Sequence, residues 1–189
     1  MSTMASHHQV KKEDLSLLDL AERLQDTNIN PQTLLTTDYL NHFSAILMLL
    51  EMMPTDPELF AIDILFWKPM GYIEHLEYSG FRESELAIAC YGYVNENTRI
   101  AFDKTIIQLD EATKLIIENI RTVLESGNLD EIARVCDVGI PQMRELISQS
   151  ACIINGNEEL IDNLTAQCIV QPDPEKTSHQ SQIDTLFVK

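Results

Sequence analysis

The sequence has few basic residues. Of its 189 residues only 13 are Lys or Arg, against 30 Asp or Glu, which gives a formal net charge of -17 at pH 7. A surface this acidic repels the phosphate backbone of nucleic acids and the anionic surface of membranes. We therefore expect a protein that binds neither nucleic acid directly nor a membrane.

Long apolar runs are also absent. The run Ile46–Leu50 is followed at once by Glu51, and it is much shorter than the roughly 18 residues that a membrane-spanning helix needs. Residues 1–12 are polar and lack the apolar segment of a signal peptide. We therefore expect a cytoplasmic protein that is not exported.

Recognisable metal and cofactor motifs are missing as well. The four cysteines include no Cys-x-x-Cys pair, which disfavours a zinc site and is typical of buried, reduced thiols. The chain has no glycine-rich phosphate loop, no GxSxG elbow and no HExxH motif. We expect no metal and no cofactor, and none of these motifs indicates an enzyme.

What the sequence does contain is helical patterning. Hydrophobic residues make up 44% of the chain, which is enough for a core, and they recur at helical rather than strand spacing. This pattern predicts an all-α fold, a bundle of about six to seven helices. The expected helices span residues 11–25, 30–53, 56–67, 70–78, 83–93, 95–126 and 129–154.

Three features of these helices carry specific expectations. Asn30 and Pro31 have the order of a helix cap and first turn, so the second helix is expected to start there. The last two long helices are expected to form an antiparallel hairpin, because residues 126–128 make a short turn between them. Pro141 is expected to kink or break the final helix. Large apolar side chains at helical spacing are expected in the core: Met48, Met52, Met53, Phe60, Phe66, Trp67 and Met70.

The character of the chain changes toward its C-terminus. We expect residues 1–10 to be disordered, 11–156 to form the helical domain, and 157–170 to be a weak helix or a linker. Residues 171–182 contain two prolines and no apolar side chain, so 171–189 is expected to be a flexible tail. Hydrophobicity returns at Ile183–Val188, which is typical of a peptide that orders when it docks on a partner.

The tail segment 180–187, QSQIDTLF, resembles a known docking peptide. It is similar to the CheY-binding peptide of the bacterial flagellar switch protein FliM, which reads roughly SQ-x-x-IDALL, and to the segment that closes the chemotaxis phosphatase CheZ. His179, Thr185 and Phe187 stand where that peptide has Ser, Ala and Leu. The expected partner-binding residues are Gln180, Gln182, Ile183, Asp184, Leu186 and Phe187.

The motif also makes physical sense as a docking helix. Asp184 would lie near a helix start, where a negative charge is favourable. Ile183, Leu186 and Phe187 fall at positions i, i+3 and i+4, so they would share one apolar face. The resemblance therefore implies a helical signalling adaptor that captures a CheY-like receiver in a bacterial two-component system.

The same letters support two other interpretations. Residues 180–187 resemble the peptide that binds the replication clamp of eukaryotes and archaea, and residues 182–187 resemble the bacterial sliding-clamp motif with Thr185 as an extra residue. Either match implies a replication or repair accessory protein. Alternatively, the tail packs on its own domain, and the chain is a non-enzymatic helical oligomerisation protein. The sequence leaves the oligomeric state open, a dimer included.

The receiver hypothesis also predicts where catalysis would occur. Phosphatases of CheY-like proteins carry a carboxylate that contacts the receiver and an amide that orients the attacking water. Asp38 and Asn41 are the candidate catalytic pair, because an i, i+3 spacing places them on one helix face. The same two residues also suit a polar surface at a helix start. His42 and His75 have contexts more typical of structural histidines than of phosphotransfer sites.

Overall fold

The structure, a computed structural model, describes residues 22–169 of the chain. These residues contain seven α-helices and one 3-10 helix, with no β-strand among them, so the predicted all-α fold is confirmed. Most of the first expected helix and all six predicted docking residues of the tail lie outside this range. The elements are η1 (Thr37–Leu40), α2 (Asn41–Met52), α3 (Pro57–Phe66), α4 (Tyr72–Tyr78), α5 (Ser84–Tyr91), α6 (Glu96–Ser126), α7 (Glu131–Ile154) and α8 (Glu158–Ile169).

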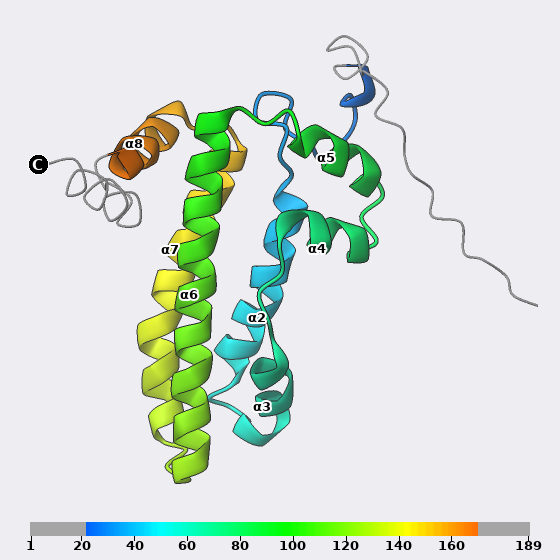
Figure 1. Cartoon of the computed structure of the whole chain (residues 1–189). Helices are drawn as coiled ribbons and strands as arrows, with labels where there is room; N and C mark the ends of the chain where they lie inside the picture. The colour runs from blue at the N-terminus through cyan, green and yellow to red at the C-terminus, as the bar shows by residue number, and fades with distance from the viewer. Residues whose placement is uncertain (1–21, 170–189) are drawn as a thin grey trace, which may run out of the picture.

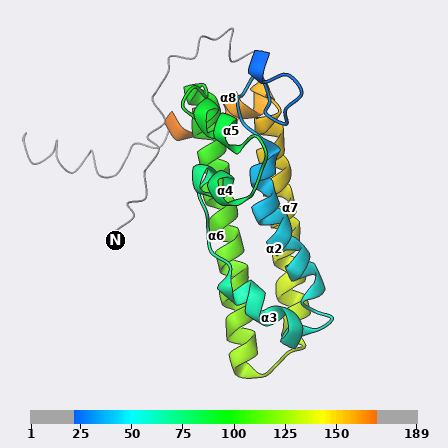
Figure 2. The same ribbon diagram turned by 90° about the vertical axis from the view of Figure 1, so that its right-hand side faces the viewer.

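Two long helices, α6 and α7, form the spine of the molecule (Figure 1). They lie side by side along most of their length and are joined by residues 127–130. The helix α2 packs along α7, and α3 packs on α2 and α6. Figure 2 shows α4 and α5 stacked above α3, with α8 at the end of the bundle opposite the α6–α7 turn.

The sequence sets the ends of α6 directly. At its start, the side chain of Asn95 accepts a hydrogen bond from the backbone N–H of Asn97 at 2.9 Å, which satisfies one of the free donors of the first turn. At its end, Gly127 adopts a left-handed conformation with φ of 71°, which glycine reaches without steric cost. The chain therefore turns sharply there, and α7 can return along α6.

The helix α7 is continuous through Pro141, so the expected break is not present. A proline in a helix removes one backbone hydrogen bond, while the side chains before and after it hold the helix in place. Cys136, Met143 and Leu146 are all buried. Gly139, two residues earlier, faces α6 and has Ile116 packed directly against it. Packing on both sides of the proline therefore keeps α7 whole.

The second helix begins later than Asn30. The side chain of Asn30 accepts hydrogen bonds from the N–H groups of Gln32 and Thr33, at 2.8 and 3.2 Å, but these bonds close a turn rather than start a helix. Leu34 has a positive φ of 61°, and Ile29 pairs with Thr36 in an isolated antiparallel bridge. A left-handed residue cannot continue an α-helix, so helical structure starts only at Thr37.

Several apolar side chains expected in the core face solvent instead. Phe66 is 75% exposed, and Leu59 and Ile62 on the same helix are 63% and 65% exposed. We call these three residues the outer face of α3. Met48 and Met52 of α2 are 56% and 42% exposed. The helix α3 carries apolar side chains on its solvent face as well as on its packed face. The core expectation was wrong for Phe66, Met48 and Met52.

The helix α8 packs against the bundle. Ile161 is buried, and Lys104 of α6 donates to the carbonyl of Leu164 at 3.4 Å and to the side chain of Gln167 at 3.1 Å. Near the start of α8, the hydroxyl of the buried Thr33 donates to the carbonyl of Ile154, at the end of α7. These contacts tie both ends of the described chain to one end of the bundle.

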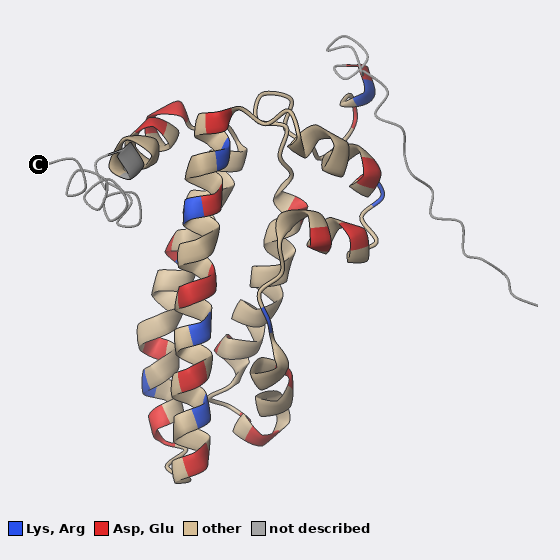
Figure 3. Cartoon of the chain, in the orientation of Figure 1, with Lys and Arg blue, Asp and Glu red and all other residues tan. Residues whose placement is uncertain are grey.

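The few basic residues are unevenly placed (Figure 3). Each of the α-helices carries at least one acidic residue, and these are spread over the molecule. Most Lys and Arg side chains of residues 22–169, by contrast, belong to the α6–α7 pair. Within the same residues, no helix combines the length and the apolar character that crossing a membrane requires. The basic residues of the pair are Arg99, Lys104, Lys114, Arg121, Arg134 and Arg144.

Candidate functional site

A hollow of about 360 Å³ lies between the start of α2 and α4. Both members of the candidate catalytic pair line it, so the structure brings Asp38 and Asn41 to one site as their spacing predicts. It also adds residues that sequence reasoning did not place there. The side chains that matter for its chemistry are Asp38, Asn41, His42, His75, Ser79 and Phe81.

The short helix η1 positions Asp38. Thr36 caps η1: its hydroxyl oxygen accepts from the N–H of Asp38 at 3.2 Å and donates to the Oδ2 atom of Asp38 at 2.9 Å. The side chain of Asn28 also donates to this oxygen, at 3.5 Å. One oxygen of the carboxylate is thus used to hold the loop, which leaves Oδ1 as the atom that could meet a partner.

Asn41 lies on the same side as Asp38 for a local reason. Residues three apart eclipse one another in a 3-10 helix, and the N–H of Asn41 bonds the carbonyls of Asp38 and Tyr39 at the end of η1. The Asn41 side chain is exposed, and its amide makes no hydrogen bond within residues 22–169. It is therefore open to water or to a group of a second protein.

Two tyrosines hold α4 against this region. The N–H of Thr36 donates to the hydroxyl of Tyr72 at 3.0 Å, and the hydroxyl of Tyr39 donates to the carbonyl of Met70 at 2.8 Å. Burial raises the pKa of both phenols far above the usual value, so both stay protonated. These bonds bring His75 of α4 across from α2.

His42 is the least satisfied side chain at the hollow. Its ring stacks on Trp67, with centroids 5.1 Å apart and planes inclined by 23°, and lies 5.9 Å from the ring of His75. Its Nε2 atom is buried and has no hydrogen-bond partner in the described part of the chain. Burial, and then the neighbouring His75, lower the pKa of His42, so the imidazole is neutral at pH 7.

The site can therefore bind and orient, but it shows no activated nucleophile. The Ser79 hydroxyl accepts from the N–H of Phe81 at 3.2 Å and sits beside no base at hydrogen-bond distance within the described residues. No three His, Cys, Asp or Glu side chains of residues 22–169 gather as metal ligands. What the hollow offers is an exposed amide, a held carboxylate and a neutral imidazole, which suit the positioning of water or of another protein's polar group.

Sequence reasoning missed the contact between His42, Trp67 and His75. The three rings come from three separate segments: α2, the residues after α3, and α4. No local spacing joins them, so only packing reveals the cluster. The six tail residues, Gln180, Gln182, Ile183, Asp184, Leu186 and Phe187, lie outside the described residues, and their docking role stays a prediction.

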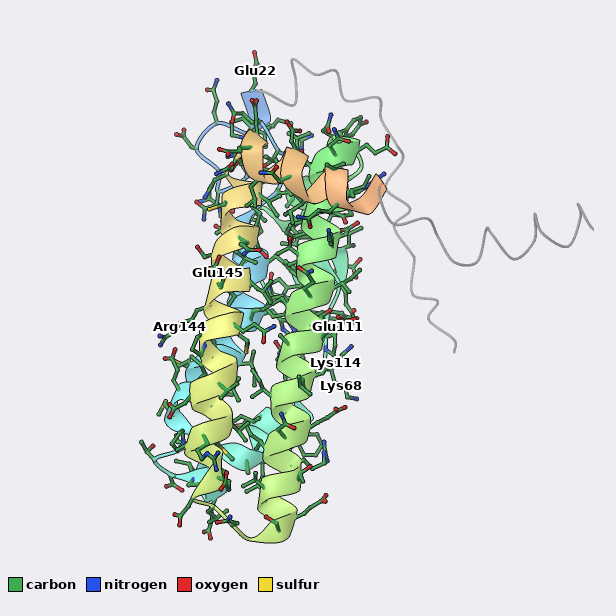
Figure 4. All side chains as sticks on the ribbon, turned by 90° about the vertical axis from the view of Figure 1, so that its left-hand side faces the viewer. Glu22, Lys68, Glu111, Lys114, Arg144 and Glu145 are labelled. Carbon is green, nitrogen blue, oxygen red and sulfur yellow. The ribbon has the colours of Figure 1, made fainter. Side chains whose placement is uncertain are left out.

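A second hollow, of about 290 Å³, lies on the outer side of the long helix pair. We call it the α6–α7 groove. Leu115 and Val138 line it and are 57% and 80% exposed. The small residues Ala112 and Gly139 leave the depression between them, and Asn119 adds a polar group. Figure 4 shows this side, with α6 and α7 in front and α8 across one end.

Comparison of the chain with protein-family models, with curated proteins and with solved structures found no match.

Proposed function

We propose that this protein is a helical signalling adaptor that binds the receiver domain of a CheY-like response regulator through its C-terminal segment. The match of residues 180–187 to the receiver-binding peptide carries the proposal. The bulk of the chain supports it in a general way, because a helical domain with an appended peptide keeps the bound partner at a high local concentration.

A finer proposal concerns the hollow beside α2. Asn41 and Asp38 present an amide and a carboxylate on one side, and the Asn41 amide has no internal partner among the described residues. An exposed amide of this kind can orient a water for attack on an aspartyl phosphate of a bound receiver. We propose that the adaptor promotes dephosphorylation of the receiver with Asn41 as the water-positioning group.

The first test is a titration of the tail. A labelled peptide of residues 178–189 is mixed with a CheY-like receiver, with and without a beryllofluoride phosphoryl mimic, and binding is followed by fluorescence polarisation. We expect micromolar binding that strengthens with the mimic and is lost in the Ile183→Ala, Leu186→Ala peptide. Binding that survives these two substitutions would show that the motif is not what the receiver recognises.

The finer proposal needs the full chain. The rate of phosphate loss from a phosphorylated receiver is measured with the unaltered protein, with Asn41→Ala and with Asn163→Ala, an exposed asparagine of α8 that serves as a matched control. We expect Asn41→Ala alone to remove the acceleration. If the unaltered protein accelerates phosphate loss and neither substitution changes the rate, Asn41 is not the water-positioning group. If the unaltered protein gives no acceleration, it binds the receiver without acting on it.

A sliding clamp is the second candidate partner, because residues 182–187 also resemble the bacterial clamp-binding motif. The same labelled peptide is titrated with a clamp. Binding to the clamp and not to the receiver would make the protein a tethered replication or repair accessory factor. The acidic surface then fits a protein that reaches DNA through its clamp rather than by direct contact.

A further inference from the structure

The α6–α7 groove has the chemistry of a peptide-binding surface. Leu115 and Val138 stand exposed on either side of a depression whose small residues, Ala112 and Gly139, add no bulk. Amphipathic helices bind such grooves with apolar anchors spaced at i, i+3 and i+4. The groove is small, so a short peptide, rather than the face of a globular domain, fits its size.

The chain itself carries a peptide of this type. Ile183, Leu186 and Phe187 have the i, i+3, i+4 spacing of groove anchors, and they follow a polar segment. The described chain ends at Ile169, the last residue of α8, and Figure 4 shows α8 on the same side of the molecule as the α6–α7 groove. The outer face of α3, by contrast, belongs to the other side of the helix pair (Figure 1).

The length of chain between α8 and the motif fits the distance. Lys104 of α6, which bonds α8, and Leu115 of the groove are eleven residues apart on one helix, so they are separated by about 16 Å along its axis. Residues 170–182 provide thirteen residues between Ile169 and Ile183. A segment of that length without regular structure spans roughly 20 Å on average. The motif therefore reaches the groove of its own chain.

Charge does not oppose this placement. The charged residues that line the groove are Arg134 and Glu131, which pair with each other at 3.0 Å. Residues 170–189 contain three acidic and two basic residues. Asp184 therefore meets less repulsion at this paired rim than at the more acidic parts of the surface.

We propose that residues 183–188 occupy the α6–α7 groove of their own chain whenever no partner protein holds them. The inference rests on the docking role proposed for the tail but not on the identity of the partner. A receiver or a clamp must then compete with the groove, so the apparent affinity of the full chain is lower than that of the free peptide. The groove thereby sets a threshold for partner binding.

Methyl NMR of the full chain tests this directly. The resonances of Leu115 and Val138 are compared between the unaltered chain and a chain with Ile183→Ala, Leu186→Ala and Phe187→Ala. We expect these two residues to shift, while Ile62 on the outer face of α3 does not. Identical groove spectra in the two chains would overturn the proposal. A shift that vanishes on dilution would also overturn it, because the tail would then be bound by a second molecule.

A second experiment separates this inference from the proposed function. Val138→Asp closes the groove to apolar anchors, and Ile62→Asp, a similarly exposed position on α3, is its control. If the tail occupies the groove nine-tenths of the time, Val138→Asp strengthens receiver binding by the full chain about tenfold, and Ile62→Asp leaves it unchanged. If the receiver binds but the methyl resonances do not shift and Val138→Asp does not strengthen binding, the groove proposal is wrong and the receiver proposal stands. If the methyl resonances shift but no receiver binds, the groove proposal stands and the receiver proposal is wrong.

Discussion

Gly139 of α7 lies so close to Ile116 of α6 that a β-carbon at position 139 would overlap the Cγ1 and Cδ1 atoms of the isoleucine. Both residues are buried. A glycine in a helix interior costs roughly 1 kcal/mol relative to alanine, and here that cost allows the two longest helices to approach. The pair therefore depends on a residue that local helix propensity disfavours.

We expect Gly139→Ala to destabilise the fold by on the order of 1–2 kcal/mol, because overpacking a core costs more than the gain in helix propensity. Chemical denaturation followed by circular dichroism measures this. Gly92→Ala is the control, since a β-carbon there has only the Ala89 carbonyl oxygen nearby, at 3.7 Å. In an Ile116→Ala background, Gly139→Ala should become neutral or stabilising; an unchanged loss would mean that the overlap with Ile116 is not its cause.

Asp110 should make the protein less stable at neutral pH than at acidic pH. Its Oδ1 atom is buried without a partner in the described chain, and burial raises its pKa from 3.8 to about 6. The folded state thus holds a proton more tightly than the unfolded state, and this contribution to stability is lost as pH rises through about 6. Asp110→Asn should stabilise the fold at pH 7 by on the order of 2 kcal/mol and change little near pH 4.

The comparison for Asp110 is Glu118→Gln, an exposed carboxylate two turns further along the same helix. The denaturation midpoints of both variants and of the unaltered protein are measured at pH 4 and pH 7. If Asp110→Asn and Glu118→Gln behave alike at both pH values, the charge of Asp110 is not buried in solution.

His42 should act in the opposite direction. Because its folded-state pKa is lowered, the unfolded chain binds the proton more readily, and the contribution of His42 to stability is lost as pH falls through 6.5. An NMR titration of the His42 ring should give a lower midpoint in the folded protein than in the urea-unfolded chain. In His42→Phe, which keeps an aromatic ring on Trp67, the loss of stability on acidification should be smaller. Equal midpoints in the two states would refute this.

Thr33 should contribute more to stability than an ordinary helix threonine. Its buried hydroxyl donates to the carbonyl of Ile154, at a helix end where no backbone donor is available. Thr33→Val keeps the shape and leaves that carbonyl unpaired, at a cost of about 1–3 kcal/mol. Thr122→Val is the matched control, because the exposed Thr122 bonds only its own helix, at the carbonyl of Glu118. Similar losses of unfolding free energy in the two variants would contradict this role.

The long helices were predictable because their signals are local. Periodic apolar residues, the Asn95 cap and the Gly127 turn lie within α6 or at its ends, and the same-side placement of Asp38 and Asn41 follows from their spacing. The start of α2 was not predictable from Asn30, because an asparagine side chain closes a turn with the same hydrogen bonds that cap a helix. The stack of His42 on Trp67 could not be predicted either, since it depends on how distant segments pack.

The exposed side chains of Leu59, Ile62 and Phe66 have a consequence for how molecules of this protein behave toward one another in solution. Each molecule carries a formal charge of -17 at pH 7, and at low salt this repulsion keeps apolar faces from meeting. Its range falls from about 10 Å at 0.1 M salt to about 3 Å at 1 M. The net charge itself falls toward zero as pH approaches the isoelectric point of about 4.5, so the repulsion weakens there too. The colloidal stability of the protein is therefore electrostatic in origin, and added salt or acid should turn the net force between molecules from repulsive to attractive.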